Sequence, residues 1–198
     1  MFHSPAQGSG IEERAVSLIE GEDTFHGTPD DLFFGHARLA PVGAAGPEVI
    51  TLARKNARMR ITVRGLDRRI PEDRYYLTVE IPNDGYDFVG NPIAGTARVR
   101  RTGAFHDNGD FSTDEAFNLI HTDPAVSPAG GVTVNLYEKA LGRSADRLIA
   151  SVTDDDGRPI SLPAGRTVNL LIDLNEGEGL SVYTEITPWD EIYQWDIW

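Results

Sequence analysis

The chain has 198 residues, 40% of them hydrophobic, so it is long enough and apolar enough to bury the core of one folded domain. Its formal net charge of −13 argues against binding to the phosphates of nucleic acids or to anionic lipid surfaces. It contains no cysteine, which excludes disulfides, thiolate metal sites and cysteine nucleophiles.

Residues 1–30 are rich in glycine, serine, proline and acidic residues, and they predict an N-terminal extension or the remnant of a preceding domain. Within them, apolar residues share one helical stripe, so a short helix is expected over Ile11–Glu20. The first residues lack the basic and apolar regions of a leader peptide. No apolar run reaches the roughly 18 residues of a transmembrane helix. The protein is therefore expected to be either cytoplasmic or exported with its leader absent from this chain.

From about Leu32 the sequence changes to short apolar strands separated by polar turns, which predicts a sandwich domain over residues 31–198. Residues 58–64 and 75–81 alternate strictly between apolar and polar side chains, as strands with one buried and one wet face do. Further strands are predicted over residues 96–102, 115–121, 132–136, 147–153, 168–174, 180–186 and 192–197. About nine short strands joined by glycine-containing turns predict an all-β fold, an antiparallel β-sandwich with an irregular N-terminal extension.

One pairing between strands is suggested by charge. The outer face of residues 58–64 is basic, whereas that of residues 75–81 carries Glu80. Opposite charges on neighbouring strands stabilise a sheet by about 0.2–1 kcal/mol. We therefore expect these two strands to lie side by side.

The candidate metal ligands are explained by ordinary turns. Asp154–Gly157 and Asp107–Asp110 gather oxygens as calcium loops do, but neither continues to the glutamate that closes an EF-hand. Acidic residues at such turns commonly bond to their own backbone. The five histidines show no zinc-binding spacing. No metal site and no cofactor are expected.

Enzymatic chemistry leaves no motif in this sequence. There is no G-x-S-x-G nucleophile elbow. Carboxylates are abundant, but no spacing singles out a catalytic pair. The chain is therefore expected not to be an enzyme, and we assign no catalytic residue.

Eight of the 18 basic residues lie between Arg54 and Arg74. On an acidic chain this asymmetry could guide docking to an acidic neighbour. A wet strand face followed by a polar loop would give the same pattern. Both interpretations remain open.

The last ten residues hold all three tryptophans. In a final strand, Tyr193 and Trp195 would share one face, and Trp198 would lie on the opposite, polar face. The strand could close the sandwich core. Alternatively, the C-terminal tryptophans could form the aromatic platform of a carbohydrate-binding surface module.

Several segments after residue 30 occur in a recognisable order. They are Asp31–Gly35, Ile50–Arg54, Ala57–Gly65, Tyr75–Ile81, Val132–Leu136, the hairpin Leu148–Leu162, Thr167–Asp173, and a closing Ile186, Trp189 and Trp198. Their texture and spacing, over roughly residues 31–198, resemble the fimbrillin-related minor or anchor subunits of Bacteroidales type V pili. The resemblance is carried by strand pattern and not by an invariant motif.

The resemblance implies transthyretin-like β-sandwich domains, export to the cell surface or outer membrane as a lipoprotein, and assembly by strand exchange between subunits. Family members carry a lipid-anchoring cysteine after the leader and a further N-terminal domain. This chain has no cysteine, and most of the first domain is missing, so membrane attachment would need an anchor not present here. Strand exchange has a clear physical basis, because an extended strand from a neighbour completes an open sheet edge.

The resulting hypothesis is a non-enzymatic fimbrial minor or anchor subunit that acts in cell adhesion. Its expected partners are other fimbrial subunits and ligands on host or bacterial surfaces. Two aromatic-rich segments, Leu32–Arg38 and Ile192–Trp198, are the candidates for a sheet edge or an exchanged strand. The partner-binding candidates within them are Leu32, Phe33, Phe34, Tyr193, Trp195 and Trp198. Besides the carbohydrate-binding alternative, a calcium-dependent structural module is a third possibility.

Overall fold

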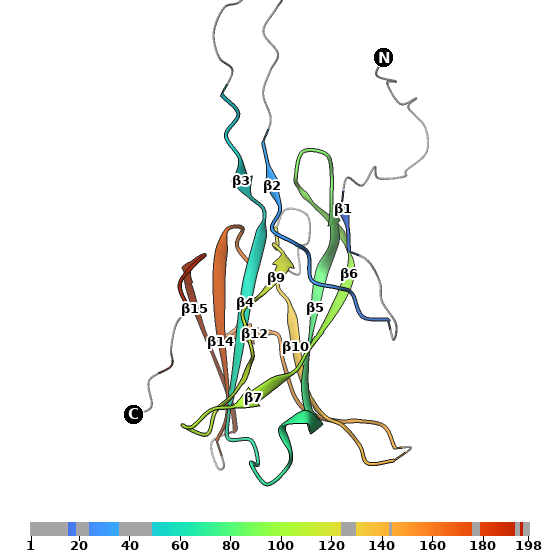
Figure 1. Ribbon diagram of the computed structural model, residues 1–198, viewed down its shortest axis with the longest axis vertical. Coiled ribbons are helices and arrows are strands. Elements are labelled where there is room, and N and C mark those ends of the chain that lie inside the picture. Colours follow the sequence, from blue (N-terminus) through green and yellow to red (C-terminus); the bar gives the residue numbers. More distant parts are fainter. Residues whose placement is uncertain are drawn as a thin grey trace, which may run out of the picture.

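Two β-sheets pack face to face in the computed structural model, which describes residues 16–18, 24–35, 49–123, 130–142, 144–175, 179–192 and 195 (Figure 1). The predicted all-β sandwich is confirmed. One short 3-10 helix, η2 (Glu72–Arg74), precedes the longest strand. Within the described part of the chain, no helix is long and apolar enough to cross a bilayer. The transthyretin-like topology stays a prediction.

The first sheet is built around β5 (Tyr75–Tyr86), which pairs with β6 (Pro92–Arg101) and with β10 (Thr133–Glu138). Strand β11 (Arg147–Val152) lies outside β10. The two residues of β1 (Val16–Ser17) pair with the end of β5 at Tyr86 and Gly85. The helix expected over Ile11–Glu20 is therefore wrong at Val16–Ser17, because these two residues form backbone hydrogen bonds with the end of β5 instead. Residues 11–15 and 19–20 of the expected helix lie outside the described residues.

The second sheet has the order β15-β14-β4-β8-β7. Its strands are β4 (Asn56–Arg64), β7 (Gly103–Phe105), β8 (Phe111–Thr113), β14 (Arg166–Asn175) and β15 (Gly179–Pro188). Strand β9 (Phe117–Ile120) pairs with the first residues of β4. The β14–β4 pair is parallel, an exception to the predicted antiparallel arrangement. Two short ribbons, β2 (Phe33–Phe34) with β3 (Ala53–Arg54) and β12 (Asp154–Asp155) with β13 (Arg158–Pro159), complete the described strands.

The expected pairing of residues 58–64 with residues 75–81 is wrong. These residues belong to β4 and β5, which lie in different sheets and face each other across the core. Glu80 instead stands opposite Arg98 on β6 and forms an ion pair with it. On β4, Arg64 forms ion pairs with Asp110 and Asp173. Charge complementarity between strands is present, but with other partners.

The core is made by the alternating side chains that the sequence pattern predicts. Each of the following exposes 1% of its surface or less: Ala57, Met59, Ile61 and Val63 on β4, and Tyr75, Leu77, Val79 and Ile81 on β5. Burying one such large side chain contributes about 1.5–3 kcal/mol. The inward faces of these two strands are therefore a main source of stability.

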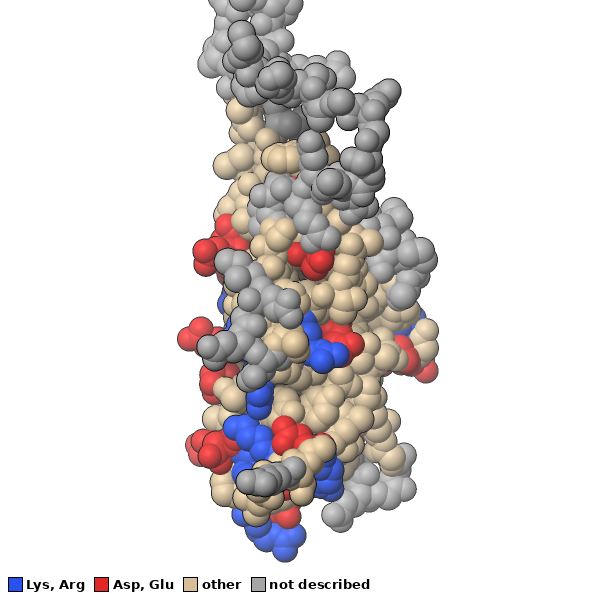
Figure 2. All heavy atoms as spheres, turned by 90° about the vertical axis from the view of Figure 1, so that its right-hand side faces the viewer, with Lys and Arg blue, Asp and Glu red and all other residues tan. Residues whose placement is uncertain are grey.

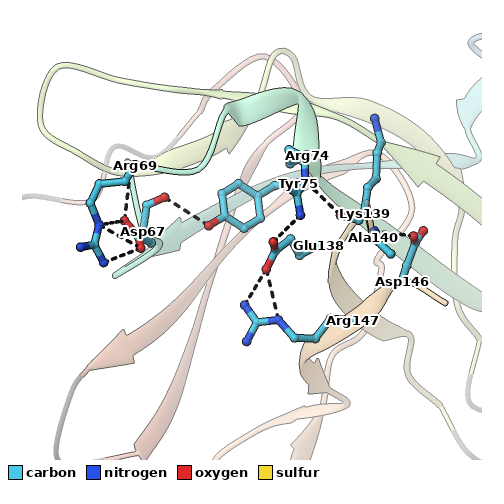
Figure 3. Close-up of polar contacts among 9 residues, drawn as sticks. All are labelled: Asp67, Arg69, Arg74, Tyr75, Glu138, Lys139, Ala140, Asp146 and Arg147. Carbon is cyan, nitrogen blue, oxygen red and sulfur yellow. Dashed lines mark hydrogen bonds and ion pairs between the residues drawn. The ribbon is translucent and has the colours of Figure 1, made fainter. Parts of the chain in front are cut away.

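At one end of the sandwich, polar contacts fix the start of β5 against the end of β10 (Figure 3). The guanidinium of Arg74 donates to Glu138 at 2.6 Å, and Arg147 donates to the other oxygen of the same carboxylate at 2.6 Å. In the loop before η2, the side chain of Arg69 donates to Asp67, and this hydrogen bond lowers the pKa of the Asp67 carboxyl from 3.8 to about 2.

Tyr76 gives a prediction on alkaline stability. Burial, together with the hydrogen bond that its hydroxyl donates to Asp146 at 2.8 Å, raises its pKa from 10.0 to about 12. The folded state thus favours the neutral phenol. This stabilisation is fully present below pH 10 and is lost as pH rises toward 12. We expect Tyr76→Phe to lower the free energy of unfolding by about 1 kcal/mol at neutral pH, because the hydrogen bond is lost.

Denaturant unfolding at neutral pH and across the range from pH 10 to 12 tests this expectation. Tyr76→Phe should show a smaller alkaline loss of stability than the parent. The control is Tyr137→Phe, which removes a hydroxyl from the neighbouring ring. The Tyr137 ring stacks on that of Tyr76, with centroids 5.1 Å apart. An alkaline decline as steep in Tyr76→Phe as in the parent would contradict the assignment.

Candidate functional site

Strand β15 is the outermost strand of the second sheet, and all ten of its residues pair with β14 on one side. The backbone N–H of Thr184 donates to the side chain of Asp155 at 3.0 Å, so it points away from β14. Backbone groups in an antiparallel strand alternate in direction, so the amides of Val182 and Ile186 also point outward. We call this side of β15, with Leu180, Val182 and Ile186, the open edge.

The open edge carries apolar side chains that are not fully covered. Ile186 stands opposite Val168, which is 1% exposed in the core, so Ile186 lies on the core-side face of the sheet. Leu180 and Ile186 nevertheless remain 45% and 47% exposed. Leu180, Val182 and Ile186 share one face, as expected for the strand predicted over residues 180–186, and Val182 packs against the core. Leu180 and Ile186 lie on the outermost strand, where the described part of the opposite sheet does not bury them.

The β12–β13 hairpin lies against the middle of the open edge. Asp155 accepts hydrogen bonds from both the backbone N–H and the hydroxyl of Thr184, the latter at 2.6 Å. A hollow of about 280 Å³ separates the hairpin from β15, with Ile160 and Ile186 in its lining. A carboxylate at a strand edge discourages unwanted pairing. The hollow leaves room beside it for a side chain from another strand.

The first predicted aromatic segment forms part of a ribbon that projects past the sheets (Figure 1). The backbone N–H of Leu32 donates to the side chain of Asn56 at 2.6 Å, and the carbonyl of Leu32 accepts from Lys55 at 2.9 Å. The Phe34 ring packs 5.7 Å from the ring of Tyr86. Phe33 is 47% exposed. The side chains of His36–Arg38 lie outside the described residues.

The final strand expected over residues 192–197 is wrong at Ile192 and Trp195, the two residues of this range that the structure describes. β15 ends at Pro188, and a turn follows in which Glu191 donates to the carbonyl of Pro188 at 3.0 Å. The Trp195 ring then lies 6.5 Å from that of Tyr183 on β15. Tyr193 and Trp198 lie outside the described residues.

Arg54, the first residue of the basic run, joins the first aromatic segment to Trp189 in the turn after β15. The guanidinium of Arg54 lies 4.4 Å from the centre of the Phe33 ring and 4.0 Å from that of Trp189, and it forms an ion pair with Asp31. Arg58 also contacts Trp189, at 5.3 Å from the ring and 3.1 Å from the carbonyl. Arg54 opened the basic run in the sequence, but its aromatic partners are visible only in three dimensions.

This arrangement bears on two earlier interpretations. The guanidiniums of Arg54 and Arg58 take up surface of the Trp189 ring that a sugar would need. Several other members of the basic run have carboxylate partners, namely Arg64, Arg69 and Arg74. The basic run is therefore better explained as a solvent-facing surface whose arginines form ion pairs within the chain. Among the described residues, no group of three or more histidines and carboxylates could hold a metal ion.

Comparison with known families gives a match over nearly the whole chain. The sequence model of the family described as fimbrillin-A associated anchor proteins Mfa1 and Mfa2 matches residues 6–195. No curated protein matches the chain in sequence.

The fold is shared with a solved structure. The chain is similar to the fimbrial anchor protein Mfa2 from Porphyromonas gingivalis, with 13% identity, a TM-score of 0.54, and coverage of 94% of this chain and 69% of that one. A candidate adhesin from Bacteroides ovatus has 12% identity and a TM-score of 0.46, with coverage of 90% of this chain and 63% of that one. A candidate cell adhesion protein from Bacteroides uniformis has 11% identity and a TM-score of 0.43, with coverage of 71% of this chain and 52% of that one. The chain thus spans from about half to about two thirds of these structures.

The contact of Arg54 with Phe33 and Trp189 predicts a local effect on stability. Arg54→Gln removes the charge that faces Phe33 and Trp189, and cation–π contacts are worth about 0.5–2 kcal/mol each. We expect faster hydrogen exchange at the Lys55 amide, which donates to Leu32. Arg69→Gln, which alters only an exposed loop, is the control. Unchanged exchange at Lys55 in Arg54→Gln would show that Arg54 does not hold the ribbon.

Proposed function

The chain belongs to the family of fimbrillin-A associated anchor proteins Mfa1 and Mfa2, and on this basis we propose that it is a minor or anchor subunit of a fimbrium that acts in cell adhesion. The fold supports the proposal, since it is shared with a fimbrial anchor protein at a TM-score of 0.54. In this role the protein is structural and has no catalytic activity. Its partners are other fimbrial subunits, with ligands on host or bacterial surfaces as further targets.

We further propose that the subunit assembles by β-strand addition at the open edge. The observation that carries this proposal is a ten-residue outermost strand whose core-side residues Leu180 and Ile186 are about half exposed. An added strand would bond to the outward amides of Val182 and Ile186. Its alternate side chains would cover the exposed stripe and enter the adjoining hollow. Main-chain bonds would give affinity, and the fit of side chains would give selectivity.

Asp155 would control access to this edge. Its carboxylate occupies the Thr184 amide at the centre of β15, so an incoming strand has to displace it. The displaced carboxylate loses two hydrogen bonds to Thr184, but it returns to solvent, where it is well hydrated. The barrier is therefore modest, and it keeps the edge from pairing indiscriminately.

The aromatic segments supply a second contact in this proposal. Phe33, Ile50 and Leu52 are 47%, 53% and 62% exposed and lie on the β2–β3 ribbon and its continuation, a projecting apolar surface. The partner-binding role of Leu32, Phe34 and Trp195 belongs to the same surface and to the C-terminal segment beside β15. The same role is proposed for Tyr193 and Trp198.

The proposal extends to organisation and location. Residues 31–198 form the unit that assembles, and residues 1–30 are an extension or the remnant of a preceding domain. The protein acts at the cell surface or outer membrane after export, held there by a lipid anchor. The family assignment supports this location.

The open edge is tested by charging it. Ile186→Lys places an ammonium on an exposed edge position, so the fold should tolerate it while strand addition is blocked. Size-exclusion chromatography with light scattering should then show that the complex with fimbrial subunits of the source organism is lost or weakened at least about tenfold. Leu141→Lys, at a 78% exposed leucine far from β15 in sequence, is the matched control.

A second variant tests the gating role of Asp155. Asp155→Ala frees the Thr184 amide, so complexes with the same subunits, or self-association, should form faster than in the parent. Complex formation by Ile186→Lys at the parent's affinity, with Asp155→Ala also unchanged, would reject the open edge as the assembly site. The family membership would stand in that case, and the projecting ribbon would be the next surface to test.

A further inference from the structure

A pocket of about 700 Å³ lies on the side of the sandwich away from β15. It is formed where the N-terminal segment 28–30 passes over the end of β6 and the β8–β9 connection. Its volume falls in the range of small-molecule sites. The residues that matter below are Thr28, Asp30, Arg101, Asp114, Glu115 and Phe117.

Arg101 is the unusual member of this lining. It stands opposite Leu77, a fully buried core residue, so its side chain lies on the core-side face at the edge of β6. Its guanidinium lies 4.8 Å from the centre of the Phe117 ring, and one terminal nitrogen donates to the Thr28 hydroxyl at 3.0 Å. The Nε atom is buried without a hydrogen-bond partner among the described residues. Burial also lowers the pKa of Arg101.

Other partly buried arginines of the chain have a carboxylate partner. Arg64 and Arg74, 27% and 22% exposed in their side chains, each form ion pairs with carboxylates. Within the described residues, Arg101 forms no such pair. A partly buried charge without a counter-charge is costly. A ligand carboxylate beside the guanidinium would supply the missing counter-charge.

The rim of the pocket narrows the class of ligand. Asp30, Asp114 and Glu115 are exposed there, and their carboxylates accept hydrogen bonds but donate none. They would repel an acidic peptide or a phosphorylated ligand with several negative charges. Hydroxyl groups, in contrast, can donate to them. Figure 2 shows that basic and acidic side chains are interspersed on the side of the molecule that carries β6, which does not suit a polyanion.

We propose that this pocket binds a sugar acid, a uronic or sialic acid unit whose single carboxylate pairs with Arg101 while its hydroxyl groups bond to the acidic rim. The site involves none of the tryptophans and no part of β15. It gives a subunit at the cell surface a means of recognising acidic glycans. The proposal is independent of strand addition, and either can fail without the other.

Isothermal titration calorimetry with the full chain tests the proposal. The probes are glucuronate, galacturonate and N-acetylneuraminate, with glucose, acetate and glutamate as comparisons. At least one sugar acid should bind with a Kd in the millimolar range or tighter, and both glucose and acetate should bind much more weakly. Arg101→Gln should weaken the sugar acid by about 10- to 100-fold, the worth of a charged hydrogen bond. Arg98→Gln on the same strand, whose partner is Glu80, should leave it unchanged.

Three results would overturn the proposal. They are no binding of any sugar acid, equal binding of glucose and glucuronate, and binding of acetate or glutamate as tight as that of the sugar acids.

A stability measurement guards against a purely structural role of Arg101. Because its burial is not offset by a counter-charge, Arg101→Gln should melt at the same temperature as the parent or higher. If it instead fails to fold, Arg101→Lys keeps the charge but loses Nε and the planar fork, and should fold with weakened binding. A folded Arg101→Lys that binds sugar acids as the parent does would also overturn the proposal.

Discussion

The outermost strands of a β-sandwich have unpaired backbone groups and partly uncovered core-side faces, and the main features of this structure depend on how these edges are covered. The edge at β6 is covered by the N-terminal segment. The backbone N–H of His26 donates to the carbonyl of Arg98 at 2.7 Å, and the Arg98 N–H donates to the His26 ring at 3.1 Å. Farther along, the buried side chain of Asn56 bonds to both Leu32 and Asp30. Residues that look irregular in sequence thus protect this edge.

The opposite side is treated differently. β15 pairs fully with β14, and among the described residues its outer side meets the short β12–β13 ribbon, with Asp155 bonded to Thr184. Leu180 and Ile186 therefore remain half exposed on a face that would be buried if one more strand were present. A folded protein gains nothing by itself from such an edge. The proposed addition of a partner strand would cover both side chains.

The arginines show the same contrast between satisfied and unsatisfied groups. Arg74 and Arg147 share the carboxylate of Glu138 at one end of the sandwich (Figure 3), and Arg54 contacts the Phe33 and Trp189 rings at the other. These contacts use the positive charge within the chain. Arg101 has a ring and a hydroxyl but no described carboxylate, so its charge is free to recognise one from outside. The pocket around it is where binding of a small ligand is physically favoured.

The sequence by itself determined that residues 58–64 and 75–81 form strands and which of their side chains enter the core, because alternation is a local property of an extended chain. It also pointed to the family through the order of those strands. Only the tertiary structure decided that Glu80 meets Arg98, that Arg54 meets Trp189, and that Arg101 lacks a carboxylate among the described residues. The stripe of Leu180 and Ile186 reads like any buried stripe, yet it lies at an edge. The reason is that the neighbouring strands come from distant parts of the chain, and the periodicity within one strand carries no information about which strands will pair with it.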